Sequence, residues 1–364
     1  MSRTHEGGMA DSEQRRTGLL PEPLTIEEVD RHTILPIRRP DIWAIYKTIE
    51  GLYWPAHEPD LSLERNHWLN RMTAGDRAYY KYVFAIFGPA DEKINKNLDD
   101  RFLNEFKSKE VMYAYGAQRV NEQAHSESYA LQISAVFDDE QDEVFRAAET
   151  MPVVTKLMKW VDSWICSDEP LGTRVCAFGF FEGGIFQCLF MSLQLLKERN
   201  IMPGVTMLNE LIARDEGVHC ALACLILRNY IANRPSMEQV HQIMAEAIAI
   251  VDELIDTACS DARKAEGLPP SAPCPVKFIS EDKMKCYARS VFDSVAVDMG
   301  YPKLFGVENP YPEAAKLALN GVLKTNFFEN DPTQYSIDID FTFRMDTSRF
   351  AKGMGLRLIR RAML

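Results

Sequence analysis

Four Glu-x-x-His pairs give this chain its first candidate chemistry, because that spacing can bind a metal ion from a single helix. Residues three apart on an α-helix lie about one turn from each other on the same face, so the carboxylate and the imidazole point the same way. A tyrosine, Tyr129, follows one of the pairs by one further turn. The pairs are Glu64/His67, Glu122/His125, Glu216/His219 and Glu238/His241.

The surroundings of the four pairs divide them into two kinds. The first and the last pair lie at polar helix starts, where acidic residues are common, so we expect both to be ordinary solvated surface. The third pair leads into the apolar run 220–227, and the second is followed by Tyr129. These two inner pairs are therefore the candidate metal ligands.

A single glutamate interrupts the most apolar segment of the chain. Between Arg174 and Lys197 the only charged residue is Glu182. The segment is long enough to cross a membrane, but a mid-span glutamate beside Gly183 and Gly184 favours a helix buried inside a bundle. A buried carboxylate needs a partner, because an unpaired buried charge is costly. A buried carboxylate is ordinarily neutralised by a salt bridge or by protonation. A bound metal ion is the third way to neutralise it.

Together these residues fit the ligand set of a carboxylate-bridged di-metal site. Helical bundles with such a site use one acid from each of two helices and a Glu-x-x-His pair from each of two others. Here Glu182 supplies one acid, and Asp91, one helix before Glu122, supplies the other. Two ferrous ions would balance the four carboxylates, so the buried site would be neutral. Nitrogen and oxygen ligands favour iron or manganese.

At this point the sequence resembles the small, radical-generating subunit of class I ribonucleotide reductase, of the eukaryotic or large-virus kind. The resemblance covers roughly residues 24–343. It implies an all-α, ferritin-like helical bundle with two iron ions per chain. The residues that carry it are Asp91, Glu122-Gln-Ala-His125-Ser-Glu-Ser-Tyr129, Phe181-Glu182-Gly183, Asn209-Glu-Leu-Ile-Ala-Arg-Asp215-Glu216-Gly-Val-His219-Cys220 and Lys324-Thr-Asn-Phe-Phe-Glu329.

The resemblance also implies roles for the candidate residues. Dioxygen activated at the iron would oxidise Tyr129 to a stable radical inside an apolar pocket that contains Phe186, Phe190 and Ile212. Each of these three shares a helical face with a ligand, but without the resemblance all of them would be plain core. The implied iron ligands are Asp91, Glu122, His125, Glu182, Glu216 and His219.

A route for an electron and a proton to a large subunit is implied as well. It would run through His125, Asp215 and Trp54 and leave the chain at Tyr335. Taken alone, Trp54 would be a core residue and Asp215 would orient a metal ligand, a role that is compatible with the route. The large subunit would reduce ribonucleoside diphosphates to deoxyribonucleotides, and we expect the present chain to be a homodimer.

Two features depart from the family's pattern. Pro89 lies two residues before Asp91, where we expect ordinary helix formers, and it predicts a kink or a restart of the helix. At the C-terminus, residues 337–343 have the acidic, phenylalanine-containing composition of the family's docking tail, but 21 residues follow, with six basic residues and one acidic residue. We expect residues 335–343 to dock on the large subunit and residues 344–364 to be dispensable.

The composition indicates a cytoplasmic protein without a nucleic-acid or membrane partner. The net charge is -12, which does not suit binding to nucleic acid. The first 18 residues lack the apolar core of a signal peptide. No Cys-x-x-Cys pair occurs, and five cysteines in apolar helical stretches are expected to be buried and reduced: Cys166, Cys176, Cys188, Cys220 and Cys224.

We predict three parts: a disordered tail (1–24), one helical domain (25–328) and a flexible C-terminal tail (329–364). Asp76 and Ser236 are candidate helix caps. Helices are expected near residues 40–54, 63–72, 76–106 with a break at Pro89, 110–136, 141–166, 171–198, 204–231 and 236–264, and in one or two segments up to about 322.

Two other functions on a similar fold stay open. A stand-alone di-iron or manganese–iron oxidase or desaturase would not need Tyr129, Trp54 or Tyr335, and it would have an apolar substrate channel. A ferritin-type iron store would be a shorter chain that assembles into a shell. The two tyrosines favour the radical-generating subunit over both alternatives.

Overall fold

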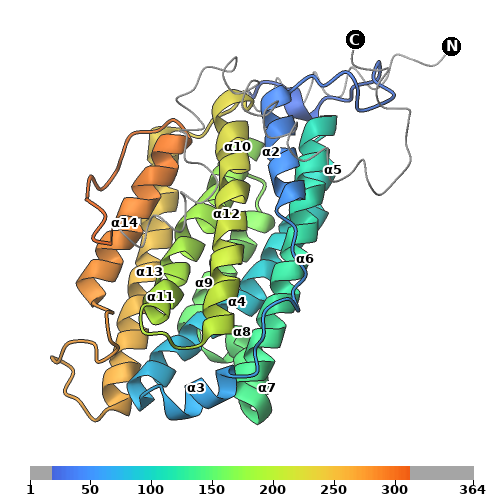
Figure 1. Ribbon diagram of the computed structural model, residues 1–364. Helices are drawn as coiled ribbons and strands as arrows, with labels where there is room; N and C mark the ends of the chain where they lie inside the picture. The colour runs from blue at the N-terminus through green and yellow to red at the C-terminus, as the bar shows by residue number, and fades with distance from the viewer. Residues whose placement is uncertain (1–18, 312–364) are drawn as a thin grey trace, which may run out of the picture. The chain divides into compact units, whose positions relative to one another are not determined.

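A computed structural model describes residues 19–311 as a bundle of helices that run side by side (Figure 1). Every regular element in these residues is helical, which confirms the all-α fold class. The principal helices are α2 (Pro40–Gly51), α3 (Glu64–Asn70), α4 (Ala74–Asn97), α6 (Lys109–Phe137), α9 (Pro152–Ile165), α10 (Leu171–Phe180), α11 (Phe186–Lys197), α12 (Pro203–Asn229), α13 (Met237–Ala265) and α14 (Glu281–Asp298).

Local capping residues fix where two of the long helices begin. The Thr73 side chain accepts the backbone N–H of Asp76, and the Asp76 carboxylate accepts the N–H of Thr73, which closes a capping box at the start of α4. Asp76 is therefore the third residue of the helix and Thr73 its cap, so the predicted cap is wrong by three residues. Ser236 caps α13 as predicted, with Gln239 in the partner position.

A kink or a restart was predicted at Pro89; helix α4 continues through this residue, so the restart does not occur. Proline removes one backbone hydrogen bond and crowds the preceding turn. The helix is nevertheless held in place on both sides, because Phe87 before the proline and Asp91 and Ile94 after it are buried. Packing therefore outweighs the local penalty, and it keeps Phe87 and Asp91 on one helical face.

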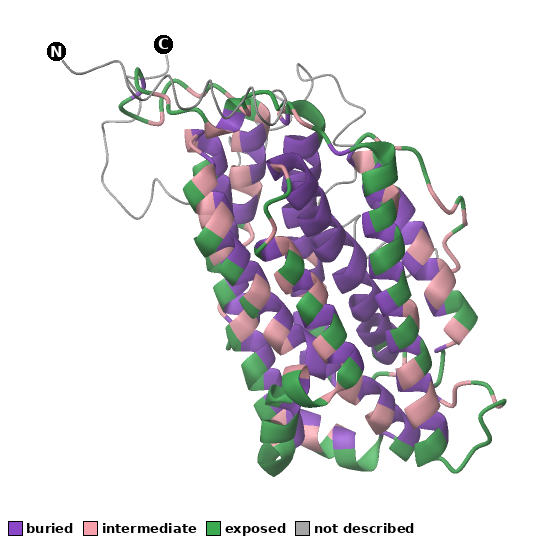
Figure 2. Ribbon diagram, turned by 180° about the vertical axis from the view of Figure 1, so that it is seen from behind, coloured by how far each residue is buried: buried purple, intermediate pink, exposed green. Residues whose placement is uncertain are grey.

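The most apolar segment lies in the middle of the bundle. Helices α10 and α11 are joined by a π-helical turn, η4 (Phe181–Ile185), into one element, Leu171–Lys197. That element is long and apolar enough to cross a membrane, but its most apolar window is entirely buried among the other helices (Figure 2). The structure therefore shows the buried core helix that Glu182 predicted. The π turn contains Glu182, and such turns are frequent at functional sites.

The single helix predicted over residues 141–166 is in fact three pieces. They are α7 (Gln141–Phe145), α8 (Ala147–Thr150) and α9. Met151 is extended and Pro152 is the first residue of α9, because proline disfavours a helical residue before it and suits a helix start. Cys166, just after α9, is exposed, which contradicts its prediction, whereas the other four cysteines named above are buried.

The Glu64/His67 pair is not ordinary surface, contrary to the prediction. Glu64 is fully buried, and its carboxylate accepts the N–H of Gly204 at 2.8 Å. His67 Nδ1 accepts the N–H of Met202 at 3.0 Å. The pair thus binds free N–H groups at the start of α12, and burial raises the pKa of Glu64 to about 7. In the fourth pair Glu238 is exposed, as predicted, but His241 is only partly exposed, and its Nε2 is buried.

The segment before α2 lies against the bundle. Leu24 is buried, and its carbonyl accepts the N–H groups of Lys107 and Ser108 at the start of α6. Glu110 in the first turn of α6 binds the buried Arg31 from this segment. The predictions for residues 1–18 and 312–364, which include Tyr335 and the segment 335–343, lie outside the described residues.

Candidate metal centre

The bundle brings all six predicted ligands to one buried place. They come from four elements: α4, α6, the π turn η4 and α12. None of the six has any exposed surface, and within each of two groups one ligand atom from every residue lies within 4.8 Å of the others. The groups are Asp91, Glu122 and His125, and Glu122, Glu182, Glu216 and His219.

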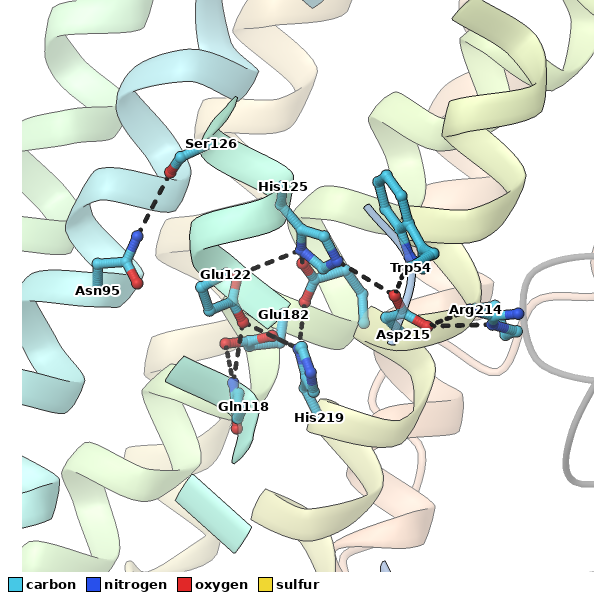
Figure 3. Close-up of polar contacts among 11 residues, drawn as sticks. Trp54, Asn95, Gln118, Glu122, His125, Ser126, Glu182, Arg214, Asp215 and His219 are labelled. Atoms are coloured by element: carbon cyan, nitrogen blue, oxygen red, sulfur yellow. Dashed lines mark hydrogen bonds and ion pairs between the residues drawn. The ribbon is translucent and has the colours of Figure 1, made fainter. Parts of the chain in front are cut away.

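Two of the carboxylates, Glu122 and Glu216, each face both histidines; Figure 3 labels Glu122 beside His125 and His219. Glu122 Oε1 lies 2.9 Å from His219 Nδ1, and its Oε2 lies 3.3 Å from His125 Nδ1. Glu216 Oε1 lies 3.1 Å from His125 Nδ1, and its Oε2 lies 3.2 Å from His219 Nδ1. Each carboxylate therefore spans two positions, one beside each imidazole, as a ligand that bridges two metal ions must do.

The buried carboxylates of the site need positive charge to balance them. Burial raises the pKa of both Asp91 and Glu182 well above the usual range, and repulsion from the neighbouring carboxylates is the next largest cause. Burial opposes a charge on His125 and His219, but their contacts with carboxylates raise both imidazole pKa values. Without a cation, protons must balance this cluster of acids. Divalent ions would displace those protons, as metal binding to carboxylates and imidazoles generally does.

The donor atoms themselves also fit a metal pair. Both oxygens of Asp91 are buried without a hydrogen-bond partner in the described part of the chain, and so is Oε2 of Glu182. Buried carboxylate oxygens rarely go without a partner, because losing water is costly for them. A set of four carboxylates and two imidazole nitrogens suits iron or manganese. The cluster could therefore hold a di-metal centre.

A buried glutamine, Gln118, joins two of the acids and was missed by sequence reasoning. Its Nε2 donates to Glu182 Oε1 at 3.0 Å and to Glu122 Oε1 at 3.2 Å (Figure 3). It therefore fixes the orientation of carboxylates on two different elements. The available signal was its position four residues before Glu122, which puts both on one face of α6.

Tyr129 lies next to this cluster in an apolar surrounding. Its side chain is buried, and its hydroxyl has no hydrogen-bond partner among residues 19–311. Phe87 stacks on its ring, with the centroids 4.6 Å apart and the planes 3° apart. Burial and the nearby Asp91 raise the pKa of Tyr129 well above its usual range. The neutral phenol is therefore the stable protonation state.

Phe87 also connects Tyr129 to the predicted pocket residues. Its ring centroid lies 5.2 Å from that of Phe190 and 6.1 Å from that of Phe186. Ile212 is fully buried in α12, one turn before Glu216. Sequence reasoning missed Phe87, although its position four residues before Asp91 could have indicated a place beside the site.

The three residues of the predicted transfer route are in contact with one another. Trp54 Nε1 donates to Asp215 Oδ2 at 2.7 Å, and the same oxygen lies 3.3 Å from His125 Nε2. The Trp54 and His125 rings are nearly parallel, with centroids 5.9 Å apart. Arg214 binds the other Asp215 oxygen (Figure 3). It also donates to the carbonyl of Leu52, and so fixes the carboxylate to the segment that carries Trp54.

Comparisons with known sequences point to one family. The family model described as ribonucleotide reductase, small chain, matches residues 31–310. The chain is 40% identical over 317 residues to the ribonucleoside-diphosphate reductase small chain of African swine fever virus (strain Badajoz 1971 Vero-adapted), covering 86% of this chain and 92% of that protein. It is 35% identical to the protein of the same name from Vaccinia virus (strain Ankara), covering 88% of this chain and 100% of the relative.

Solved structures agree with this assignment. The ribonucleotide reductase Rnr4 homodimer from Saccharomyces cerevisiae is similar with a TM-score of 0.68 and 25% identity, covering 84% of this chain and 92% of that chain. The dimanganese(II)-NrdF of Streptococcus sanguinis has a TM-score of 0.62 at 16% identity, with 76% and 94% covered, and supports the ferritin-like fold alone. By sequence and by fold, this chain belongs to the family of ribonucleotide reductase small chains.

Proposed function

We propose that this small chain generates and stores, on Tyr129, the radical that a ribonucleoside-diphosphate reductase uses. The observation that carries the proposal is the position of that tyrosine. It is buried on the helix that carries Glu122 and His125, the Asp91 carboxylate helps to raise its pKa, and its hydroxyl is unpartnered among the described residues. A tyrosine that only fills the core would bond its hydroxyl, as Tyr80 does with the carbonyl of Ser192.

Two iron ions are the proposed cofactor. Asp91 and His125 would bind one ion, Glu182 and His219 the other, and two carboxylates that face both histidines would bridge them. When bound, such ions react with dioxygen and provide an oxidant for one electron. The chain's own residues hold the acids in place through Gln118 and keep water away by burial.

Trp54, Asp215 and His125 are the proposed route towards the large subunit. Asp215 accepts the indole N–H, so it can hold that proton while an electron moves through the ring. Arg214 donates to the other oxygen of Asp215 and keeps the carboxylate oriented. Tyr335 is the proposed next member of the route.

The proposed partners are a large subunit and a second copy of this chain, in the cytoplasm. The large subunit would bind residues 335–343, whose tyrosine, acids and phenylalanines suit a segment that orders on binding. The homodimer is supported by the yeast relative, whose structure is described as a homodimer.

An oxidase that acts on a lipid is less well supported. It would need an apolar channel beside the metal site. The apolar cavity lined by Val83, Ile185 and Leu189, between α4, α11 and α13, has a volume of about 20 Å³. That is space for one water-sized molecule and not for an acyl chain.

A reductase assay tests the proposal. The full chain, loaded with ferrous iron in air, is mixed with the large subunit from the same source, and deoxyribonucleotide formation is measured. We expect activity from the unaltered chain and none from Tyr129→Phe with the same metal content. Activity retained by Tyr129→Phe would contradict the proposal.

A further inference from the structure

Two cysteines from different elements, Cys259 and Cys274, share a hydrogen bond between their sulfur atoms. Cys259 lies in α13 and is completely buried. Cys274 is partly exposed in the loop 266–280, which joins α13 to α14 (Figure 1). The Cys259 thiol donates to the Cys274 sulfur. The end of the helix and half of the loop separate the two residues in the sequence, so the fold of the loop brings them together.

Further hydrogen bonds hold the loop against α13 at this point. Arg263 lies one turn after Cys259 on the same face of α13. Its guanidinium donates to the carbonyl of Ala272 at 3.4 Å, and Ala272 comes two residues before Cys274. The Cys274 sulfur also accepts the backbone N–H of Val276. The position of Cys274 beside the buried thiol is therefore fixed on both sides of the residue.

The surroundings favour the thiolate form of Cys274. The hydrogen bond from Cys259 lowers the pKa of Cys274, and the N–H of Val276 lowers it further. Partial burial and the Glu281 carboxylate oppose this change, whereas the Arg263 charge supports it. The Nε of Arg263 is buried without a hydrogen-bond partner in the described part of the chain, so this donor is available to a nearby thiolate. The net direction is a lowered pKa.

The two thiols are unequal, and this inequality assigns their roles. The bond that Cys259 donates to Cys274, together with burial, raises the pKa of Cys259. A thiolate is the reactive form of cysteine, and redox-sensing cysteines combine a lowered pKa, exposure to solvent and a second thiol close by. Cys220 and Cys224 on α12 lack this combination, because both are buried although their sulfur atoms lie 3.9 Å apart.

We infer that Cys259 and Cys274 are a peroxide-responsive thiol pair that closes to a disulfide. The Cys274 thiolate attacks hydrogen peroxide, the O–O bond breaks, and Cys274 becomes a sulfenic acid. The hydroxide that leaves takes up the proton that Cys274 had released and becomes water. The sulfur of Cys259 then attacks the Cys274 sulfur. The S–H and S–O bonds break, the S–S bond forms, and the proton and the hydroxyl leave as a second water.

The disulfide links the loop 266–280 covalently to α13. Its sulfur atoms must approach to about 2.05 Å, and Cys274 can make this movement because it lies in a loop rather than in a helix. A disulfide in a reducing compartment is usually a transient, redox-sensing one, so a dithiol should reopen it. The pair contains no proposed metal ligand and no member of the proposed radical route, so the inference does not depend on the proposed function.

Peroxide treatment of the full, iron-loaded chain tests the inference. Hydrogen peroxide is added to the reduced protein, the remaining thiols are alkylated, and the peptides are identified by mass spectrometry with and without dithiothreitol. We expect both thiols to be lost and one pair of peptides to be joined through Cys259 and Cys274 until dithiothreitol separates it. Cys166→Ser removes an exposed thiol and is the control, which should form the same disulfide. Thermal unfolding shows that each variant is folded.

Two single variants separate the roles of the thiols. Cys259→Ser keeps a donor but removes the second thiol, so dimedone, a reagent for sulfenic acids, should label Cys274. Cys274→Ser should leave the buried Cys259 unlabelled. Peroxide that oxidises Cys166 while Cys259 and Cys274 stay reduced overturns the inference. So does a disulfide that forms only between other cysteines, or dimedone that labels Cys259 in Cys274→Ser and not Cys274 in Cys259→Ser.

Discussion

At the scale of single residues, the site is distinguished by polar atoms that have no partner. The Asp91 oxygens and the Tyr129 hydroxyl are buried and unbonded in the described part of the chain, while Gln118 satisfies oxygens of Glu122 and Glu182. A protein core normally bonds its buried polar groups. The unbonded atoms therefore mark where the cofactor is expected and where a phenol is kept in apolar surroundings.

Removing a single ligand should abolish metal binding. We predict that Glu182→Ala and His219→Ala each lose the two metal ions per chain, because both side chains are buried in the cluster of acids and imidazoles. Elemental analysis of purified variants measures the metal content. His241→Ala is the matched control, because its Glu-x-x-His pair has an exposed glutamate. Loss of metal in a folded His241→Ala chain would refute the choice of ligands.

Trp54→Phe should separate radical storage from radical transfer. The substitution keeps an aromatic ring but removes the N–H that donates to Asp215 at 2.7 Å. We predict that the variant binds two metal ions and loses nucleotide reduction. The measurements are metal content and the reductase assay with the large subunit. Full activity in this variant would show that the route does not use Trp54.

At the scale of the elements, sequence periodicity predicted most helices, because its signals are local. The Glu-x-x-His spacing indicated the candidate ligands of α6 and α12, which the structure brings together, and the apolar run indicated the core helix. Glu64 was predicted wrongly because its partner, Gly204, lies 140 residues away in the chain. Phe87 and Gln118 were missed since each lacks a motif of its own, although each is four residues from a ligand.

A buried ion pair, Arg31 with Glu110, ties the start of α6 to the preceding segment. Arg31 donates two hydrogen bonds to Glu110, at 2.7 and 2.9 Å, and both side chains are buried. Glu110→Gln should lower the free energy of unfolding by about 1.5–3 kcal/mol, because Arg31 loses two charged hydrogen bonds and keeps only Glu28, at 2.9 Å, as a carboxylate partner. The exposed pair of Lys96 and Asp100 is the control, and Asp100→Asn should cost less than about 1 kcal/mol. Thermal or denaturant unfolding measures both.

The same pair predicts a dependence on pH. Burial would raise the pKa of Glu110, but hydrogen bonds from Arg31 and the backbone of Arg38 lower it to about 2, from the ordinary 4.5. The stabilisation is therefore complete above pH 4.5 and is lost as the pH falls towards 2. The difference in unfolding free energy between the unaltered chain and Glu110→Gln should shrink over this interval. A constant difference would contradict the assignment.

At the scale of the whole molecule, the site depends on the complete bundle. The proposed ligands span residues 91–219 and come from four elements, so no short fragment contains them. Metal that binds only the folded state stabilises it by mass action. The segment proposed to bind the large subunit lies in a different part of the sequence, so radical formation and docking can be tested separately.

Two truncated chains test the docking segment. One ends after Phe343 and the other after Gln334. We predict that both form the Tyr129 radical, and that only the longer one supports nucleotide reduction with the large subunit, because it keeps Tyr335 and the acidic, phenylalanine-containing stretch. If the chain that ends at Phe343 has its radical but no activity, the docking element lies in the basic extension 344–364.

The most direct test of the central claim is an electron paramagnetic resonance spectrum of the full chain after ferrous iron and dioxygen are added. We predict a persistent tyrosyl signal in the unaltered chain and no persistent tyrosyl signal in Tyr129→Phe, which loses only an unpartnered hydroxyl and should bind iron equally well. An unaltered chain that binds two iron ions and consumes dioxygen without any tyrosyl signal would show that Tyr129 does not store a radical. So would a persistent tyrosyl signal in Tyr129→Phe.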